Sequence, residues 1–572
     1  MKCTFHVENN QYNKCWLNTV GNKRIDLIQG IYRCFEGDII DYDENTNEIR
    51  MIEHTIPKSI PGTILFADKM YGKQSKNKYY FKFIPYENKL PAFLIPCKLE
   101  IEFHKKKRNK YAFIEFSHWS DSNKHPYGKL QRGMGYVDIP NHTYEYLLAC
   151  HNVYSPIKTL TNKTKLALKI KSISEWYEYI NSTYTIEDRR SKNSCVFSID
   201  PVGTRDIDDA CSITRINATE WRLSIYISHV PLWLDSLDLW NDVSNNVSTI
   251  YLPHENKNML PNLLSEEICS LKAGEHKFAF TLDIYMDSKY NVIRKEWKNT
   301  WIYVNSNDTY EGVIRKEYNQ IFDIVCELNQ KYPYMSNGIH NSHEVIQYMM
   351  TFMNCELANT CVSNKLGIFR TMCIGENHNQ NENETIKNLP PDLHFFMRIW
   401  NSPGGMYTMY TEENQILQHD CIGSSVYMHA TSPIRRLVDI INIALYLNHS
   451  NFFRTDSIQT FITRFYNKNY IKYINSNSKN IRQLQNESSM IHKTINDSTI
   501  LNKEYIGYVI DITNKENHIQ YNIYIPELKV THYIEYDKVL EYDLSLFKMY
   551  KWKISYIDDN YKIKKRWLLT RV

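Results

Sequence analysis

The sequence predicts a multidomain α+β protein, with small β-barrels near both ends of the chain and a mixed α/β body between them. The 572 residues exceed what one hydrophobic core can organise, so roughly three to five domains are expected. Residues 1–160 consist of short runs rich in β-branched and aromatic residues, and residues 503–572 return to this pattern. The residues between them mix strand-like alternation with long helical periodicity.

The elements follow in order along the chain. N-terminal runs such as IPGTILFAD and KYAFIEFSHW favour small barrels, of which two in succession is one arrangement. Residues 161–190 are expected to form one or two linker helices. In the body, residues 221–228 and 277–286 alternate like half-buried strands. Helices are expected over residues 309–331, 343–366, 433–448 and 455–500.

The composition is typical of a globular protein, with 42% hydrophobic and 23% charged residues. No apolar run approaches the ~18–20 residues that cross a bilayer, and the N-terminus has no signal-peptide pattern. The thirteen cysteines include no C-x-x-C pair, so reduced thiols are expected rather than a disulfide framework or a zinc site. We therefore expect an intracellular, cytoplasmic protein with no membrane contact.

Basic residues and tyrosines occur together in several places. The segments HKKKRNK at 104–110 and 551–571 are basic patches, and many of the forty-three tyrosines neighbour Lys or Arg. Aromatic faces interleaved with cations suit single-stranded nucleic acid. A codon bias towards Lys, Asn, Ile and Tyr explains the same composition, and the net charge of +4 does not decide between the two.

Four aspartates cluster in the segment S-I-D-P-V-G-T-R-D-I-D-D-A at 198–210. The cluster follows an apolar strand and lies on a turn shaped by Pro201 and Gly203. Such carboxylates repel one another unless a cation offsets their charge. One interpretation is a solvated loop, and the other is a site for divalent cations. Carboxylate-rich, Cys-poor ligation suits Mg²⁺ or Mn²⁺, and the position at the mouth of an apolar strand favours the metal site.

This segment resembles the signature of the ribonuclease II family, whose catalytic domain is called RNB. Y-L-P at 251–253, M-L-P-N-L-L-S at 259–265 and C-S-L at 269–271 are similar to further family blocks in the same order. H-A-T-S-P-I-R-R-L-V-D at 429–439 resembles the motif H-F-T-S-P-I-R-R-Y-x-D. The joint occurrence of these blocks is highly specific.

The resemblance extends to the flanks and implies a domain order similar to that of the eukaryotic exosome-type, Dis3-like members. Nothing in the chain resembles the N-terminal endonuclease domain that some of those members carry. The implied domains are a partial or divergent first cold-shock-type OB barrel at 1–58, a second at 59–160, the RNB catalytic domain with linker helices at 161–500, and a C-terminal OB-type RNA-binding barrel at 501–572.

The resemblance implies a hydrolytic, Mg²⁺-dependent 3′-to-5′ exoribonuclease, with Mn²⁺ as a substitute. Its substrate would be single-stranded RNA, its products nucleoside 5′-monophosphates, and its state a monomer. Arg435 would contact the scissile phosphate, although an arginine at this position could instead pair with a carboxylate. The residues implied to hold one or two Mg²⁺ and to position the attacking water are Asp200, Asp206, Asp208 and Asp209. Asp209 could orient the water rather than bind metal.

The resemblance also implies a set of RNA-binding residues. Tyr251 would lie near the sugar of the last nucleotides, and Tyr310 would stack on the terminal base; each could equally be structural. Ser432-Pro433 resembles a helix start whose backbone N–H groups contact phosphates, while His429 could touch RNA or support its loop. The implied RNA-binding residues are Tyr251, Tyr310, His429, Thr431, Ser432 and Arg436.

Several positions depart from the family pattern. The glutamate expected before the M-x-x-x-N of the long helix is absent from Gln347-Tyr348-Met349, and the R-x-H motif reads Arg370-Thr-Met372. These departures put the terminal base clamp in doubt, but they remove no metal ligand. Two alternatives to an active enzyme remain: a catalytically silent RNA-binding regulator of the same fold, and a purely structural protein.

Overall fold

The computed structural model divides the chain into two compact units. The first unit comprises Met1–Asn152, Leu252–His254 and Leu484–Val572, and the second comprises Val153–Tyr251 and Glu255–Gln483. The residues described are 1–21, 23–27, 32–75, 77–98, 107–120, 123–190, 195–312, 316–372, 389–390, 393, 396–397, 400, 405–412, 417–501, 503–514, 518–537, 544–557 and 566–572. Parts of the predicted basic patches, at 104–106 and 558–565, lie outside them.

The first unit begins with an antiparallel sheet of five strands in the order β3-β2-β1-β4-β5. Alternation in β1 buries Cys3, Phe5 and Val7, which join one core cluster. This is the period of two expected of a strand with one covered face. The strands are β1 (Lys2–Val7), β2 (Cys15–Thr19), β3 (Arg24–Asp26), β4 (Ile39–Asp43) and β5 (Glu48–Glu53).

A closed barrel follows in the same unit. Its strand order is β6-β10-β11-β9-β8-β7, and a further pairing of β6 with β8 closes the ring. Gly62 lies at the closure, where a Cβ atom would come within 2.3 Å of the Ile84 carbonyl oxygen, so the strands can approach only at a glycine. The strands are β6 (Ile60–Ile64), β7 (Lys73–Ser75), β8 (Lys78–Pro85), β9 (Phe93–Lys98), β10 (Lys110–His118) and β11 (Tyr127–Tyr136), and helix α1 (Pro140–His151) comes after them.

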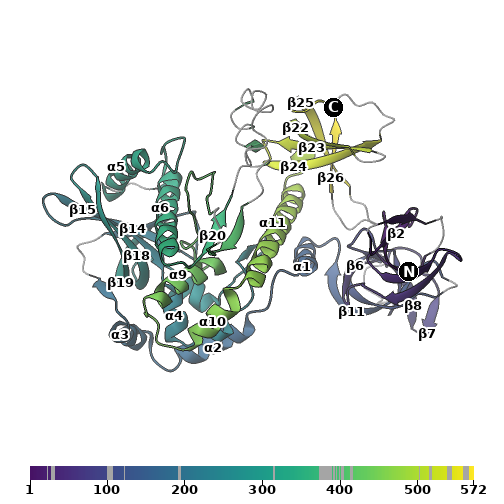
Figure 1. Ribbon diagram of the computed structural model, residues 1–572, viewed down its shortest axis with the longest axis horizontal. Coiled ribbons are helices and arrows are strands. Elements are labelled where there is room, and N and C mark those ends of the chain that lie inside the picture. Colours follow the sequence, from purple (N-terminus) through teal and green to yellow (C-terminus); the bar gives the residue numbers. More distant parts are fainter. Residues whose placement is uncertain are drawn as a thin grey trace. The chain divides into compact units, whose positions relative to one another are not determined.

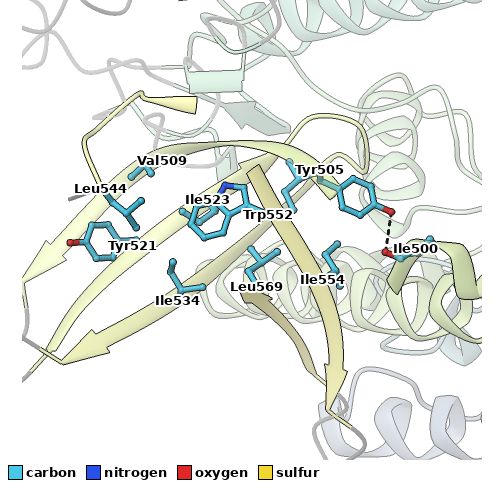
Figure 2. Packing of buried hydrophobic residues seen from close by; sticks show 11 residues of the cluster. Ile500, Tyr505, Val509, Tyr521, Ile523, Ile534, Leu544, Trp552, Ile554 and Leu569 are labelled. Carbon is cyan, nitrogen blue, oxygen red and sulfur yellow. Dashed lines mark hydrogen bonds between the residues drawn. The ribbon is translucent and has the colours of Figure 1, made fainter. Parts of the chain in front are cut away.

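The C-terminal sheet has five strands in the order β24-β23-β22-β25-β26. Figure 2 shows its core, with Trp552 among the side chains of Ile523 and Leu569. The Trp552 indole N–H donates to the Gly507 carbonyl (3.2 Å), so burial of the indole leaves no N–H without a hydrogen-bond acceptor. The elements are η4 (Ser498–Leu501), β22 (Glu504–Asn514), β23 (His518–Ile525), β24 (Val530–Asp537), β25 (Met549–Ile557) and β26 (Arg566–Arg571).

The second unit is built on a six-stranded sheet in the order β12-β19-β13-β14-β15-β18, in which β19 also pairs with β18. Arg189 on β12 donates to both carboxylate oxygens of buried Asp283 on β18, at 2.9 and 2.6 Å. This pairing compensates a buried charge. The strands are β12 (Glu187–Arg189), β13 (Val196–Asp200), β14 (Asp209–Arg215), β15 (Glu220–Ser228), β18 (His276–Asp287) and β19 (Val292–Thr309).

Helices pack around this sheet; α5, for example, contacts both β14 and α6 (Figure 1). The helices are α2 (Lys158–Leu168), α3 (Ile173–Thr183), α4 (Val230–Ser236), η1 (Trp240–Asp242), η2 (Leu263–Ile268), α5 (Lys316–Lys331), α6 (Ser342–Ser363), α9 (Leu437–His449), α10 (Ser457–Phe465) and α11 (Lys468–Asn496). The remaining strands are β16 (Ile250–Tyr251), β17 (Asn256–Lys257), β20 (Ile368–Thr371) and β21 (Met406–Met409).

Three helix predictions are wrong in their bounds. The helix predicted over 455–500 is two helices, α10 and α11, and residues 309–312 of the helix predicted from 309 are not helical, because strand β19 continues to Thr309 and a turn follows it. The helix predicted from 433 begins at Leu437, because Arg436 is extended (φ −135°, ψ 125°) and forms a β-bridge with Ser248. The helix predicted at 343–366 is present as α6, and its N-cap Asn341 accepts from the Glu344 N–H. The predicted domain boundaries stay predictions. No helix within the described ranges is long and apolar enough to cross a membrane.

Candidate active site

The aspartate segment connects two adjacent strands of the second unit. Strand β13 ends at Asp200 and its antiparallel neighbour β14 begins at Asp209, so the turn between them presents all four carboxylates at one end of the strand pair. A cavity of about 920 Å³ opens there. Its lining includes Asp200, Asp206, Asp208, Asp209, Tyr251, Tyr310 and Arg435, together with Tyr154, Arg205 and residues of the β16–β17 hairpin and η2.

Asp200 is held by a chain of hydrogen bonds from the neighbouring strand. The Ser198 hydroxyl donates to Asp200 Oδ2 (2.7 Å), and the Asn307 amide donates to Ser198 Oγ (3.0 Å). Asn307 lies on β19, which pairs in parallel with β13, and its Oδ1 accepts from the Ala273 N–H. The orientation of the Asp200 carboxylate is therefore fixed before any ligand arrives.

Asp208 is almost completely buried, with 5% of its surface exposed. Its Oδ1 accepts from the Ile434 backbone N–H (2.9 Å), and its Oδ2 lies 3.4 Å from Arg435 Nε. Oδ2 has no hydrogen-bond partner among the described residues. A buried carboxylate oxygen left in this state is costly unless a cation compensates it.

Burial raises the pKa of each of the four carboxyls. The pKa of Asp209 is raised to about 7 by burial and by the nearby Asp200 charge. Burial raises the pKa of Asp208 well above its usual range, and Arg435 partly opposes this. For Asp200 and Asp206 the direction is the same, with burial again the largest cause and Arg435 opposing it. The cluster thus concentrates negative charge with one guanidinium as its common counterion, which is a poor arrangement without a further cation.

The loop that carries Arg435 is fixed by its backbone. The Thr249 N–H donates to the Arg435 carbonyl (3.0 Å), and the Arg435 guanidinium donates to Ser432 Oγ (2.9 Å). Asp439 Oδ1 accepts from both the Ser432 N–H (2.7 Å) and the Arg436 guanidinium (2.8 Å). The expectation that the Ser432 N–H contacts a phosphate at a helix start is therefore not met in this structure, because that N–H is already donated and the helix starts later.

Asn354 on α6 supports the same loop and was not predicted from the sequence as a site residue. Its Oδ1 accepts from the Ala430 N–H (2.9 Å), and its amide donates to the Tyr427 and Thr431 hydroxyls (both 3.2 Å). Thr431 is buried, so its side chain serves this anchor. Asn354 is the asparagine of the M-x-x-x-N pattern, and this pattern could have identified it from the sequence. Asp439, the last residue of the motif H-A-T-S-P-I-R-R-L-V-D, could have been identified in the same way.

The predicted aromatic residues differ in their placement. Tyr251 lines the cavity with 41% of its surface exposed. Tyr310 lines it too, but one ring face is stacked on His343 of α6, with ring centroids 3.5 Å apart and planes at 14°. His429 is not part of the cavity lining; its Nδ1 shares a hydrogen bond with the Tyr407 hydroxyl (2.7 Å). The structure therefore brings the aspartates, Arg435, Tyr251 and Tyr310 together and places His429 elsewhere.

The donor set fits a hard divalent cation. The described cavity lining contains carboxylates, amides and hydroxyls but no histidine or cysteine, as Mg²⁺ or Mn²⁺ prefers. The unsatisfied Asp208 Oδ2 is a further point in favour. Within the described ranges, no three of the four aspartates bring ligand atoms within 4.8 Å of one another, so an ion would have to draw them together.

Comparisons with known proteins agree with this geometry. Residues 188–320 match the RNB domain family, and residues 80–152 match the Dis3-like cold-shock domain 2. The RNB match contains all four aspartates, Tyr251 and Tyr310. The chain contains an RNB domain. The predicted resemblance and the predicted fold class, with OB-type barrels beside an RNB domain, are thereby confirmed.

Proteins similar in sequence to this chain include a DIS3-like exonuclease and a ribonuclease R. DIS3-like exonuclease 2 of Schizosaccharomyces pombe is 28% identical over 236 residues, which are 39% of this chain and 24% of that protein. Ribonuclease R of Ureaplasma parvum is 33% identical over 131 residues, 21% of this chain and 18% of that protein. The chain thus matches about a quarter or less of the length of these relatives.

Solved structures show the same fold at low identity. Mycoplasma genitalium RNase R in complex with ribose-methylated single-stranded RNA has a TM-score of 0.75 at 15% identity, with 100% of both chains covered. Yeast Ssd1, a pseudonuclease, has a TM-score of 0.58 at 14% identity, covering 94% of this chain and 80% of that one. The fold therefore occurs in both an RNA-bound ribonuclease and a pseudonuclease, and the site residues must distinguish between them.

Proposed function

We propose that the protein is a Mg²⁺-dependent 3′-to-5′ exoribonuclease that hydrolyses single-stranded RNA to nucleoside 5′-monophosphates. The observation that carries the proposal is the cavity in which Asp200, Asp206, Asp208 and Asp209 meet Arg435. The similarity to a DIS3-like exonuclease and to a ribonuclease R supports the reaction class, and the single-stranded RNA bound to M. genitalium RNase R supports the substrate class.

Arg435 would stabilise the reacting phosphate. Its side chain is 43% exposed, so it can reach a ligand in the cavity, while its Nη2 is anchored on Ser432. A fixed guanidinium contributes most as the phosphate gains negative charge in the transition state. Asp208 Oδ1 accepts from the Ile434 N–H, whereas its Oδ2 accepts no hydrogen bond among the described residues and lies 3.4 Å from Arg435 Nε, so Oδ2 is the oxygen that a cation would share with Arg435.

Asp200, Asp206, Asp208 and Asp209 are the residues that would hold Mg²⁺. When bound, the cation supplies a deprotonated water at neutral pH and neutralises charge on the phosphate. The carboxylates offer the preorganised negative charge for it, and the Ser198–Asn307 chain keeps Asp200 in position. Tyr251 and Tyr310, at the cavity wall, would contact the terminal nucleotides.

A catalytically silent RNA-binding protein is the alternative, and the likeness to the pseudonuclease Ssd1 motivates it. The residues of this chain favour activity, because the four carboxylates and Arg435 all line the cavity. A binding protein gains nothing from four aspartates that line one cavity, since they repel RNA phosphates unless a cation intervenes.

The deciding experiment is a time course on 5′-labelled single-stranded RNA with Mg²⁺ or with EDTA. Wild type is compared with Asp208→Asn and with Asp323→Asn, a control at an exposed aspartate of α5. We expect a ladder that shortens from the 3′ end, requires Mg²⁺, and is lost in Asp208→Asn alone. Intact RNA that shifts on a native gel with wild type would instead establish the silent regulator.

A further inference from the structure

One amide side chain of the second unit is bonded to two segments that both lead to the aspartate cluster. The amide nitrogen of Asn307, on β19, donates to Ser198 Oγ of β13 (3.0 Å) and to the carbonyl of Leu271, which follows η2 (2.9 Å). Its Oδ1 accepts from the Ala273 N–H (2.7 Å). An amide nitrogen carries two hydrogens, and both are used here. The Ala273 N–H and the Leu271 carbonyl together fix which end of the amide is the nitrogen.

The first branch leads to Asp200. Ser198 is buried, and its hydroxyl donates to Asp200 Oδ2 (2.7 Å). A hydroxyl has a single hydrogen, so once Ser198 gives it to the carboxylate, its oxygen can only accept. Asn307 supplies the donor for that oxygen, and the parallel register of β13 with β19 pairs Ser198 with Asn307. Asn307 therefore selects the orientation in which the hydroxyl points at Asp200.

The second branch leads to the turn between β13 and β14, at Ile207, which stands between two of the aspartates. The Leu271 N–H donates to the Ile207 carbonyl (3.0 Å), and the Ile207 N–H donates to Ser270 Oγ (3.0 Å). Ser270 in turn donates to the Arg205 carbonyl (2.8 Å). The backbone of the turn is thus bonded to residues 270–271, and Asn307 holds the carbonyl of the second of them.

The two branches approach the cluster from different sides. Asp200 ends β13, whereas Asp206 and Asp208 lie on the turn that follows it. Within the described ranges, no three of the four aspartates bring ligand atoms within 4.8 Å of one another, so a cation has to draw the two sides together. A common anchor for both sides restricts their relative movement, which reduces the ordering that binding requires.

A neutral anchor suits this cluster better than a charged one. The carboxylates repel one another and gain from a cation, and a further lysine or arginine held among them would compete with a metal ion for the same charge. An amide holds both sides without changing the charge of the cluster. Asn307 lies outside the cavity lining as the structure describes it, so its effect reaches the carboxylates through its neighbours.

We propose that Asn307 is a positioning residue, which couples the two sides of the aspartate cluster and thereby raises its affinity for a divalent cation. The inference rests on the proposed function for the cation itself. Asn307 acts through Ser198 on one side and through Leu271 on the other.

The test is metal binding in the absence of RNA. Mn²⁺ is titrated into each protein, and the free ion is measured from its EPR signal in solution. The variants are Asn307→Ala and Asn307→Ser. Asn305→Ala is the matched control, because Asn305 lies two residues earlier on β19 and its Oδ1 accepts from the Val196 N–H of β13 (2.8 Å). The control removes a hydrogen bond between the same two strands, at the end of β13 away from Asp200. The unfolding temperature of each protein is measured in EDTA.

We expect both Asn307 variants to bind Mn²⁺ roughly tenfold more weakly than wild type, since two hydrogen bonds that position the ligands are lost. Asn305→Ala should bind Mn²⁺ as wild type does. RNA affinity in EDTA should be the same in all four proteins, because neither asparagine lines the described cavity. If Asn305→Ala loses as much Mn²⁺ affinity as Asn307→Ala, the loss reflects a general loosening of the two strands and the inference is refuted.

A double-mutant cycle tests the path through Ser198. In wild type, Ser198→Ala should weaken Mn²⁺ binding, because Asp200 loses its donor. In the Asn307→Ala background the same change should have a smaller effect, because the hydroxyl has already lost its own anchor. Fully additive losses would overturn the coupling.

The two proposals fail in different ways. If wild type binds Mn²⁺ and the Asn307 variants bind it equally well, the positioning role is refuted and the proposed function stands. If wild type itself binds no Mn²⁺, the proposed function fails and the positioning role fails with it.

Discussion

Replacing Asp209 by asparagine should abolish RNA cleavage and at the same time stabilise the metal-free protein. The carboxyl is buried at the start of β14 beside Asp200. Burial raises its pKa from 3.8 to about 7, which means that the folded state resists its ionisation. An asparagine has nearly the same shape but carries no charge to bury.

The magnitude follows from proton linkage. At pH 7 the unfolded chain has this carboxyl ionised, whereas the folded state keeps it about half protonated. The folded state therefore binds more protons than the unfolded state. The resulting loss in the free energy of unfolding grows as pH rises from about 4 to about 7 and is fully present above that. At about 1.4 kcal/mol for each tenfold change, the penalty near neutral pH is about 4 kcal/mol. An amide N–H left without an acceptor costs about 1–3 kcal/mol, so we expect a net gain of roughly 1–3 kcal/mol.

The assay is thermal and urea unfolding of wild type, Asp209→Asn and the surface control Asp323→Asn, each in EDTA and in Mg²⁺. In EDTA the Asp209→Asn variant should unfold at the highest temperature and urea concentration of the three proteins. Its gain in stability over wild type should shrink at lower pH. Mg²⁺ should stabilise wild type, because a ligand that binds the folded state adds to its stability, and should stabilise the variant less. A variant that is no more stable than wild type in EDTA would refute the idea that the cluster stores unfavourable charge.

Three further predictions concern single side chains. Arg435→Lys should lower the single-turnover cleavage rate by about 10²–10³ while RNA affinity in EDTA changes little; equal losses in both would argue for a binding role. His343→Ala should raise KM for RNA more than it lowers kcat, because Tyr310 loses the ring stacked on one face, and His343→Phe should restore KM. Burial lowers the pKa of His229 to about 4, whereas the unfolded value is near 6.5. The contribution of His229 to stability should therefore fall by roughly 1 kcal/mol between about pH 7.5 and 5.5, and urea unfolding should find it as the change with pH in the stability difference between wild type and His229→Gln.

The aspartate site could be predicted from the sequence because its residues lie close together along the chain. Four carboxylates within ten residues, after an apolar strand and around Pro201 and Gly203, define both the chemistry and its position at a strand end. The strands could be predicted for the same reason, since the alternation of apolar and polar residues is visible within a few consecutive positions.

Features that depend on contacts between residues far apart in the sequence could not be predicted. Helix α9 begins late because Arg436 pairs with Ser248, and nothing near Arg436 in the sequence announces that bridge. The stacking of Tyr310 on His343 joins the end of β19 to α6. Closure of the second barrel at Gly62 likewise needs the partner strand β8, whereas a single glycine in a strand predicts only some close approach.

The supports of the Arg435 loop show why this distinction matters for the chemistry. Two of them are amides. Asn354 accepts from the Ala430 N–H, a residue 76 positions away, and Asn442 donates to the His429 carbonyl (2.9 Å) while pairing with both backbone groups of Ile368. An amide donates and accepts at once, so it can fix a backbone in register without adding charge. A carboxylate at either position would lose the donated bonds and would compete for the arginines. The two amides therefore fix the backbone on either side of the loop without adding charge, and the only carboxylates that accept from its backbone among the described contacts are Asp208, at the Ile434 N–H, and Asp439, at the Ser432 N–H.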